Sequence, residues 1–199
     1  MFRPIETELT RLLRADRTER PDALHAFRVA RRWFLDGRRV DVGELATELE
    51  ISRATLFRWV GNRDQLLGEI LWSMTEDVFN ARSRSAQGTG AERIADVVGE
   101  FVRTVNDAPA FRAFLLREPE RALRILTTKA SVIQGRTMSK LEELLNAEIE
   151  AGELSPPLPV PDLAYLIVRI AESFIYTDVI TGGDPDATKA RAAIATLLS

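Results

Sequence analysis

The residues whose types and spacing indicate chemistry most clearly lie in the stretch 52–63, which holds three arginines and no acidic residue. The three are Arg53, Arg58 and Arg63. An arginine side chain presents a planar fork of N–H donors, which can pair with a phosphate group or with the edge of a guanine base. Ser52 is typical of a helix N-cap, because its oxygen can accept from amides of the first turn. The stretch therefore predicts a short helix with a cationic, hydrogen-bonding surface.

This predicted helix has two different faces. Leu56 and Val60 lie four residues apart, so both side chains are expected to point into the core. At about 100° per residue, Ala54, Thr55 and Arg58 fall on the opposite side. Small side chains allow close approach to the major groove of DNA, and a threonine offers it both a hydroxyl and a methyl group. The outward face is therefore suited to reading base pairs.

Such a helix needs neighbours that hold it in place. Apolar spacing predicts helices over residues 21–36 and 42–49, and a brief turn at residues 50–51 leads to the helix that Ser52 caps. Two short helices joined by a tight turn bury little surface alone, so the first helix must pack against both. This is the logic of a helix-turn-helix domain, which we assign to residues 21–67. The alternative is an ordinary helical hairpin whose arginines only face solvent.

The whole chain is predicted to be all-α, because its hydrophobic periodicity is helical throughout and no alternating strand pattern occurs. A helical arm is expected in residues 1–20, and a helical bundle for ligand binding and dimerisation in residues 68–199. The small polar stretch 83–90 is typical of a linker. Asp162 is expected to cap one of the later helices. Altogether about nine or ten helices are expected, and those beyond the helix-turn-helix cover the ranges 64–84, 94–105, 111–117, 119–127, 130–151, 162–180 and 186–198.

The composition excludes several classes of function. Of the 199 residues, 45% are hydrophobic and 29% are charged, which fits a globular chain with a real core. The chain has no cysteine and one histidine, His25, so it offers no thiolate, no cysteine zinc site and no imidazole pair. It also lacks a phosphate-binding glycine motif, and Glu142 and Glu143 are typical of a solvated helix surface. We therefore expect no enzymatic activity, no metal and no cofactor.

The charge of the chain is unevenly distributed. Residues 1–64 hold 13 arginines against 11 acidic residues, whereas the formal net charge of the whole chain is −3. A local basic surface is therefore possible on an otherwise acidic protein. No run approaches the roughly 18 apolar residues of a membrane-spanning helix, and the N-terminus does not resemble a signal peptide. The sequence thus predicts a cytoplasmic protein without a membrane partner.

A recognisable signature runs through residues 21–71. Its residues are Leu45-Ala46, Ile51-Ser52, Thr55-Leu56-Phe57, Trp59-Val60, Arg63-Asp64 and Leu66-Leu67. They match the pattern IA…GVS…TLYxHFxxKexLL, followed by a long connecting helix, and the segment therefore resembles the N-terminal domain of the TetR family of bacterial repressors. The stretch LFRWVGNRDQLL is also similar to the QsdR type of TetR-like regulators, which is associated with the degradation of lactone quorum signals.

The resemblance implies roles for the outward face. In the family, the positions of residues 53–55 contact bases, and the positions of Phe57, Trp59 and Arg63 contact phosphates. The implied partner is a palindromic double-stranded DNA operator, bound by a homodimer. The candidate DNA-binding residues are Ser52, Arg53, Ala54, Thr55, Phe57, Arg58, Trp59 and Arg63.

Three residues depart from the family pattern. Phe57 replaces the usual tyrosine and lacks the hydroxyl that bonds phosphate, and Val60 replaces a larger core phenylalanine. Glu50 stands where the turn usually has glycine, and a positive φ at this position would cost about 1 kcal/mol. These departures keep open a second interpretation, in which the chain is a helical ligand-binding or protein-interaction module whose helix-turn-helix does not read DNA.

Dimerisation is expected because two helix-turn-helix units about 34–36 Å apart on one face of DNA gain affinity through their linkage. The predicted helix 162–180 is apolar around most of its circumference, which is more than one core face can use. A central buried helix is the alternative, although the resemblance implies that the last two long helices form the dimer. The candidate interface residues are Phe174, Ile175, Val179, Ile194 and Leu197.

The middle helices contain apolar and aromatic residues with a few polar residues among them. Aromatic residues at helical spacing are more often plain core than ligand contacts, and Arg169 and Glu172 are close enough to pair with each other. The candidate effector-binding residues are Phe79, Phe101, Val105, Phe114, Ile133, Arg136, Arg169, Glu172 and Tyr176. They indicate a mostly apolar cavity for a lactone-like or acyl-like small molecule. Such an effector would release a repressor by favouring a conformer with wrongly spaced recognition helices, with residues 64–84 as the lever.

Overall fold

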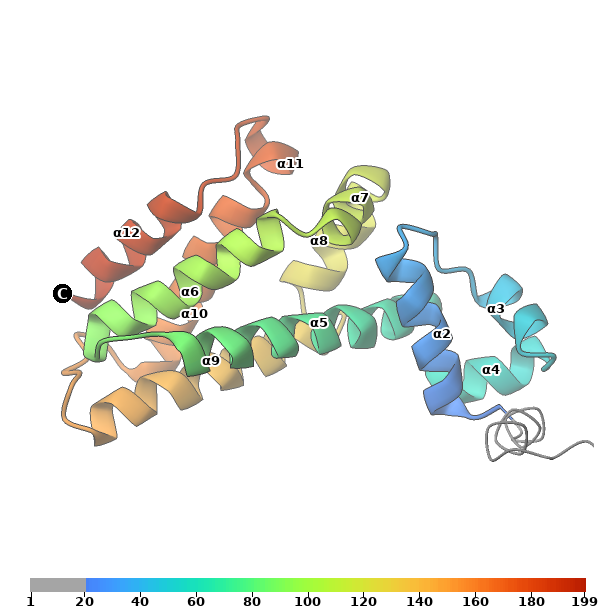
Figure 1. The fold of residues 1–199 in the computed structure, drawn as a ribbon, viewed down its shortest axis with the longest axis horizontal. Helices are drawn as coiled ribbons and strands as arrows, with labels where there is room; N and C mark the ends of the chain where they lie inside the picture. Colours follow the sequence, from blue (N-terminus) through green and yellow to red (C-terminus); the bar gives the residue numbers. More distant parts are fainter. Residues whose placement is uncertain (1–20) are drawn as a thin grey trace, which may run out of the picture.

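The structure, a computed structural model, describes residues 21–199 of the chain. The expected arm in residues 1–20 lies outside the described residues. Within residues 21–199 the fold is all-α, with eleven helices and no strand. The helices are α2 (Ala23–Leu35), α3 (Val42–Glu48), α4 (Arg53–Val60), α5 (Arg63–Ser85), α6 (Gly90–Asn106), α7 (Pro109–Arg117), α8 (Pro119–Thr127), α9 (Ile133–Glu150), α10 (Val160–Ile175), α11 (Thr177–Thr181) and α12 (Ala187–Leu198). Figure 1 shows a small bundle of α2, α3 and α4 at one end and a larger bundle of α6 to α12, joined by the long helix α5.

Side-chain caps fix the starts of the three helices in the small bundle. The carboxylates of Asp22 and Asp41 accept from amides in the first turns of α2 and α3, at 2.6 Å and 2.8 Å. The Ser52 hydroxyl accepts from the Thr55 amide at 3.0 Å, which confirms the predicted start of α4. Each cap satisfies amides that a first helical turn leaves free. These local bonds therefore set where each helix begins.

Helix α5 belongs to both bundles. It opens with a capping box, in which the Asn62 side chain accepts from the Gln65 amide at 2.9 Å and the Gln65 side chain accepts from the Asn62 amide at 2.8 Å. It then runs for 23 residues without interruption. It contacts α2 and α4 in the small bundle and α6, α8 and α9 in the larger one (Figure 1). A change in its orientation would therefore be felt at both ends of the molecule.

One hydrophobic core extends through both bundles. Leu56 of α4, Ile70 of α5 and Ile167 of α10 are all completely buried and belong to the same cluster of apolar side chains. The two bundles are therefore not separated by a hydrated gap. None of the described helices is both long and apolar enough to cross a membrane.

Helix α12 packs closely along α6. A Cβ atom added to Gly99 of α6 would lie 2.9 Å from the Cβ of Arg191 on α12, so only glycine permits this approach. Arg191 in turn pairs with Asp96 and, at 3.6 Å, with Glu92 of α6. These contacts fix the last helix to α6.

The helix expected over residues 162–180 begins earlier than predicted. Its first residue is Val160, so Asp162 lies inside the first turn and is not the cap. Pro159 and Pro161 flank that first residue, and proline suits a helix start because its missing amide would have no partner there. The other predicted ranges agree with the observed helices to within a few residues.

The same predicted helix is also interrupted, which raises the number of helices above the nine or ten expected. Helix α10 stops at Tyr176, and the short α11 follows directly. The Arg112 side chain of α7 donates to the Ile175 carbonyl at 3.1 Å and pairs with Asp178. Because Arg112 supplies a donor to a carbonyl at the end of α10, the chain can leave the helix without losing that hydrogen bond.

Candidate DNA-recognition helix and effector cavity

Helix α4 exposes the side that the sequence predicts to face outward. Leu56 is completely buried, whereas Ala54 and Arg58 are exposed and Thr55 is half-buried. Neither Arg53 nor Arg58 has a hydrogen-bonding or ion-pair partner within residues 21–199, and both are exposed. The surface thus offers two guanidinium groups to an external anion or base edge.

Side chains at the start of α4 are held in defined positions. The hydroxyl oxygens of Ser52 and Thr55 lie 2.9 Å apart, so the cap also orients the threonine hydroxyl. Arg53 passes over Gly43 of α3, where an added Cβ would lie 2.8 Å from the arginine Nη2. Gly43 therefore makes room for this arginine. No sequence motif indicates the contact, because it depends on how α3 and α4 pack against each other.

The turn between α3 and α4 contains backbone strain at Glu50. This residue has φ of +54° and is the one non-glycine residue within 21–199 with a positive φ. Its amide donates to the Thr47 carbonyl at 3.1 Å, and the Ile51 amide donates to the Ala46 carbonyl at 3.0 Å. The two bonds form a Schellman motif, which normally has glycine at the position of Glu50. The expected positive φ is confirmed, and its cost relative to glycine is about 1 kcal/mol.

The two aromatic residues of α4 differ in exposure. Phe57 is 58% exposed and projects from the helix surface. Trp59 is half-buried and packs against the core, where it lines an open groove together with Leu24 and Phe27 of α2. Val60, expected in the core, is also only half-buried. Phe57 therefore has more free surface for a DNA contact than Trp59.

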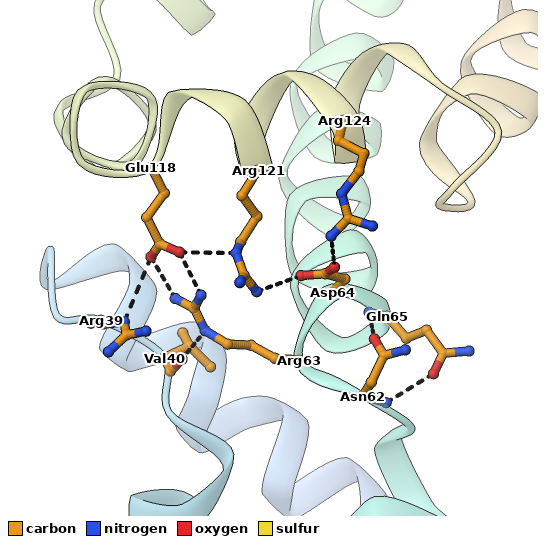
Figure 2. A network of polar contacts seen from close by, with 9 residues as sticks. All are labelled: Arg39, Val40, Asn62, Arg63, Asp64, Gln65, Glu118, Arg121 and Arg124. Carbon is orange, nitrogen blue, oxygen red and sulfur yellow. Dashed lines mark hydrogen bonds and ion pairs between the residues drawn. The ribbon is translucent and has the colours of Figure 1, made fainter.

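Arg63 does not lie on the free surface. Two of its nitrogens donate to the Glu118 carboxylate at 2.5 Å and 2.6 Å, and its Nε donates to the Val40 carbonyl at 2.5 Å (Figure 2). Only 13% of the Arg63 side chain is exposed. This corrects the expectation of a phosphate contact, because in this conformation protein acceptors already occupy the guanidinium group.

Arg63 and Glu118 belong to a larger set of charges that we call the α5–α8 ion network. Its members are Arg39, Arg63, Asp64, Glu118, Arg121 and Arg124. Arg121 lies between the two acids, 3.1 Å from Glu118 and 2.7 Å from Asp64, and Arg124 also pairs with Asp64 (Figure 2). The hydrogen bond between Arg63 and Glu118 lowers the pKa of the glutamate and raises that of the arginine. The network therefore ties the start of α5 to α8 of the larger bundle.

The spacing of charges on α8 is the sequence signal from which this network could have been predicted. Glu118, Arg121 and Arg124 follow one another at intervals of three residues, so they share one face of a helix. A charged stripe of this kind normally faces solvent. Here it faces the paired charges of Arg63 and Asp64 at the beginning of α5.

A cavity of about 130 Å³ lies in the larger bundle, with walls from α5, α6, α9 and α10 and single residues from α7 and α8. Its wall is largely apolar. Trp72, Thr137 and Lys140 also line it, although they are not among the residues predicted from the sequence. Six of the nine predicted effector-binding residues line the cavity, namely Phe79, Phe101, Val105, Ile133, Glu172 and Tyr176.

Two predicted effector-binding residues lie elsewhere. Phe114 packs edge-to-face against Phe34 of α2, with ring centroids 5.6 Å apart, so it joins the two bundles instead of lining the cavity. Arg136 pairs with Glu69 of α5 at 2.7 Å. Neither residue lines this cavity, because the partners that orient their side chains come from distant parts of the chain.

The polar residues of α9 and α10 meet at one end of the cavity. Arg169 does not line it, contrary to prediction, and donates instead to the Gln134 amide oxygen and, at 3.0 Å, to Glu172. Gln134 also donates to Glu172 at 2.5 Å. Burial raises the pKa of Glu172 and of Tyr176. Tyr176 is only 5% exposed, and within residues 21–199 its hydroxyl has no hydrogen-bond partner.

The predicted dimer residues divide into two groups. Ile194 is completely buried in the protomer and Ile175 is 4% exposed, so neither has surface left for a second copy. These two assignments are corrected, because both residues belong to the protomer's own core. Phe174, Val179 and Leu197 are half-buried and stay predicted interface residues.

An all-α chain that presents an exposed helix-turn-helix at one end and has a partly open cavity at the other has the architecture of a DNA-binding regulator. Residues 89–199 match the family described as Tetracyclin repressor-like, C-terminal domain. Among solved structures, the chain is similar to the transcriptional repressor QsdR of R. erythropolis, from the TetR family. The identity is 33%, the TM-score is 0.82, and the match covers 88% of this chain and 93% of that chain.

The chain also shares its fold with the transcriptional regulator FadR from Bacillus subtilis, whose crystal structure contains stearoyl-CoA. The identity is 14%, the TM-score is 0.53, and the match covers 88% of this chain and 96% of that chain. A comparison with curated protein sequences finds no match.

The chain therefore belongs to the TetR family of transcriptional regulators. The resemblance inferred from residues 21–71 is confirmed, and the similarity to QsdR agrees with the likeness noted in residues 56–67. Proteins of this family are regulators that bind DNA and small effectors, and they are not enzymes.

Proposed function

We propose that the chain is a homodimeric repressor that binds a palindromic operator through α4 in the cytoplasm and dissociates when a small, largely apolar effector occupies the cavity. The observation that carries this proposal is the outward surface of α4, where the exposed Arg53 and Arg58 have no partner within residues 21–199. A protein whose net charge is −3 would otherwise repel DNA, so a local cationic surface is what binding requires.

Within this proposal the residues of α4 have separate tasks. Ala54 and Thr55 allow close approach and contact base edges, while Arg53 and Arg58 supply forks that can pair with guanine. Ser52 lies at the helix N-terminus, where free amides attract a phosphate. The apolar ring of Phe57 contacts a sugar or a thymine methyl group, and Trp59 contributes through its exposed edge.

A dimer is required for the two recognition helices to reach one operator. The half-buried Phe174 and Val179 supply apolar surface near the end of α10, and Leu197 supplies it on α12. Tyr165 on α10 is 54% exposed, and large aromatic residues are enriched in interfaces. We therefore assign the exposed sides of α10 and α12 to the contact between the two copies.

We attribute release to α5 and α8, the two helices that contribute both to the cavity and to the α5–α8 ion network. Trp72 and Phe79 of α5 and Leu126 of α8 all line the cavity, and the same two helices are tied together at the α5–α8 ion network. An effector that fits the cavity better when α5 and α8 are displaced would shift the population toward that arrangement. Because α5 begins in the small bundle, the recognition helix α4 would move together with α5.

Genomic selection of duplexes by the purified full-length chain, followed by gel-shift titration on the recovered site, tests the proposal. We expect a palindromic site, a 2:1 complex of protein and duplex, and an association constant that falls linearly on a log–log plot against salt. Failure to recover a site, or affinity that does not depend on salt, would favour the helical ligand-binding module instead.

A further inference from the structure

The backbone of α3 does not require a glycine at Gly43. This residue is the second of the helix and is not among the glycines of residues 21–199 that have a positive φ. A glycine in a helical conformation loses more conformational freedom on folding than an alanine does, so it weakens the helix. The reason for a glycine in a helix of only seven residues must therefore lie in the space beside its Cα.

That space is filled by the end of the Arg53 side chain. A Cβ added to Gly43 would lie 2.8 Å from the arginine Nη2 and 3.2 Å from its Cζ, both closer than an ordinary van der Waals contact. Gly99 differs, because there the added Cβ meets the Cβ and Cα of Arg191, and α12 itself would have to move. At Gly43 only the tip of a flexible side chain is in the way. An alanine would therefore displace the guanidinium group and leave the packing of α3 against α4 intact.

The carboxylate of Asp41 borders the same space. Its Oδ1 would lie 3.1 Å from the added Cβ, and it accepts from the Glu44 amide at 3.0 Å and from the Gly43 amide at 2.8 Å. The hydrogen bond from Glu44, together with that from Gly43, lowers the pKa of Asp41 and keeps the carboxylate charged at neutral pH. Its negative charge attracts the guanidinium group toward α3. Shape and charge thus act together on Arg53, which stays exposed to solvent.

From this geometry we infer that Gly43 is a positioning residue for operator recognition, because its missing side chain lets α3 hold the guanidinium group of Arg53 in place before DNA binds. Ordering a mobile arginine side chain on binding lowers affinity, so an arginine that is already held binds more tightly. A recognition group must also stay within about 0.5 Å of its working position, and an alanine at position 43 would move Nη2 by about that distance or more. The inference rests on the proposed function, in which Arg53 contacts DNA.

A double-mutant cycle with the full-length chain on the selected operator tests the inference. Gly43→Ala should weaken operator binding by about threefold to tenfold, and Arg53→Ala by about fivefold to 150-fold, the range for the loss of one base-reading arginine. The doubly substituted chain should bind as weakly as Arg53→Ala alone, because Gly43 acts only through Arg53. Gel-shift titration measures the four affinities.

Stability should change in the opposite direction from affinity. The melting temperature of Gly43→Ala should stay the same or rise by about 1–3 °C, because alanine favours the helix and no backbone has to move. Gly135 offers a matched control, since it is an exposed glycine in the first turn of α9 with no atom within 4 Å of an added Cβ. Gly135→Ala should leave operator affinity unchanged.

NMR spectra of the arginine Nε–Hε groups detect the contact without DNA. The Arg53 resonance should shift in Gly43→Ala and stay in place in Gly135→Ala. The inference is overturned if Gly43→Ala binds the operator as tightly as the wild type, if its effect persists in the Arg53→Ala background, or if the Arg53 resonance does not shift. A fall in melting temperature together with affinity would also overturn it, since Gly43 would then be only structural. A wild-type chain that selects no operator contradicts the proposed function instead, and the spectra still show whether Gly43 places Arg53.

Discussion

Arg58 and Arg63 are five residues apart in one acid-free stretch, and the structure gives them opposite environments. Arg58 is exposed and has no partner within residues 21–199, whereas Arg63 is largely buried and bound to the Glu118 carboxylate and the Val40 carbonyl. The first is available to an external ligand, and the second holds two parts of the protein together.

The difference shows that the role of an arginine depends on acids that are distant in the sequence. Glu118 is 55 residues from Arg63, so no local charge count could include it. Within residues 21–199 the arginines of α4 have no carboxylate partner, whereas the beginning of α5 faces the charged side of α8. Exposed arginines of this kind are therefore better candidates for DNA contacts than the arginine content of the segment as a whole.

The largest expected effect is on the free energy of unfolding, to which Arg63 should contribute and Arg58 should not. Arg63→Ala should lower the free energy of unfolding by about 2–4 kcal/mol, because it leaves a largely buried carboxylate without its main partner. Urea denaturation followed by circular dichroism measures this. Arg84→Ala, which removes an exposed arginine near the end of α5, is the control and should change stability little. An Arg63→Ala variant as stable as the wild type would show that the α5–α8 ion network contributes little to stability.

The second effect concerns DNA and should leave stability unchanged. Arg58→Ala should weaken operator binding by about 1–3 kcal/mol if the guanidinium reads a base. Gel-shift titrations on the selected site and on unrelated duplexes distinguish base reading from phosphate contact, since only the former depends on sequence. Equal affinities of Arg58→Ala and Arg84→Ala for the operator would remove Arg58 from the recognition surface.

A third, smaller effect acts on the scaffold that presents Arg58. Glu50→Gly should raise the free energy of unfolding by about 1 kcal/mol, because glycine adopts a positive φ without strain. Glu50→Ala removes the same charge but keeps a Cβ, so it should bring little of this gain. Thermal denaturation of the three proteins compares them, and equal stability of the glycine and alanine variants would show that the turn is not strained.

The smallest expected effect is on the acid sensitivity of the ion pair between Arg63 and Glu118. The hydrogen bond from Arg63 holds the pKa of Glu118 below the usual glutamate value of 4.5, so its contribution to stability is present above that value. The contribution is lost as the pH falls through the lowered pKa. Glu118→Gln should therefore flatten the acid limb of the stability profile, while Glu120→Gln, an exposed neighbour, should not. If the stability of the wild type, Glu118→Gln and Glu120→Gln falls in parallel as the pH is lowered, Glu118 is not the source of the acid sensitivity.

Features that depend on neighbouring residues were predictable from the sequence. Ser52 caps α4 and Leu56 points inward, because capping and helical periodicity act over one or two turns. Glu172 and Tyr176 line the cavity as expected, since polar residues on an otherwise apolar helix need a reason to face inward.

Features that depend on chain packing were not predictable. The sequence pattern places Arg136 at the cavity, but Glu69 on α5 draws it away. The pattern also places Ile194 in the dimer interface. When a helix has apolar residues on several sides, however, its sequence does not show which side packs into the core of the protomer. The interruption after Ile175 depends on Arg112, which arrives from α7. Each of these outcomes is decided by a residue on another helix.

The unbroken course of α5 has a geometrical consequence. Its 23 residues form a rod about 35 Å long at 1.5 Å per residue. A tilt of about 5° at the cavity end would displace the opposite end by about 3 Å, close to the rise of one base pair along B-DNA. A change in angle too small to disturb the packing around the cavity would thus be enough to put the recognition helix out of step with the bases of the operator.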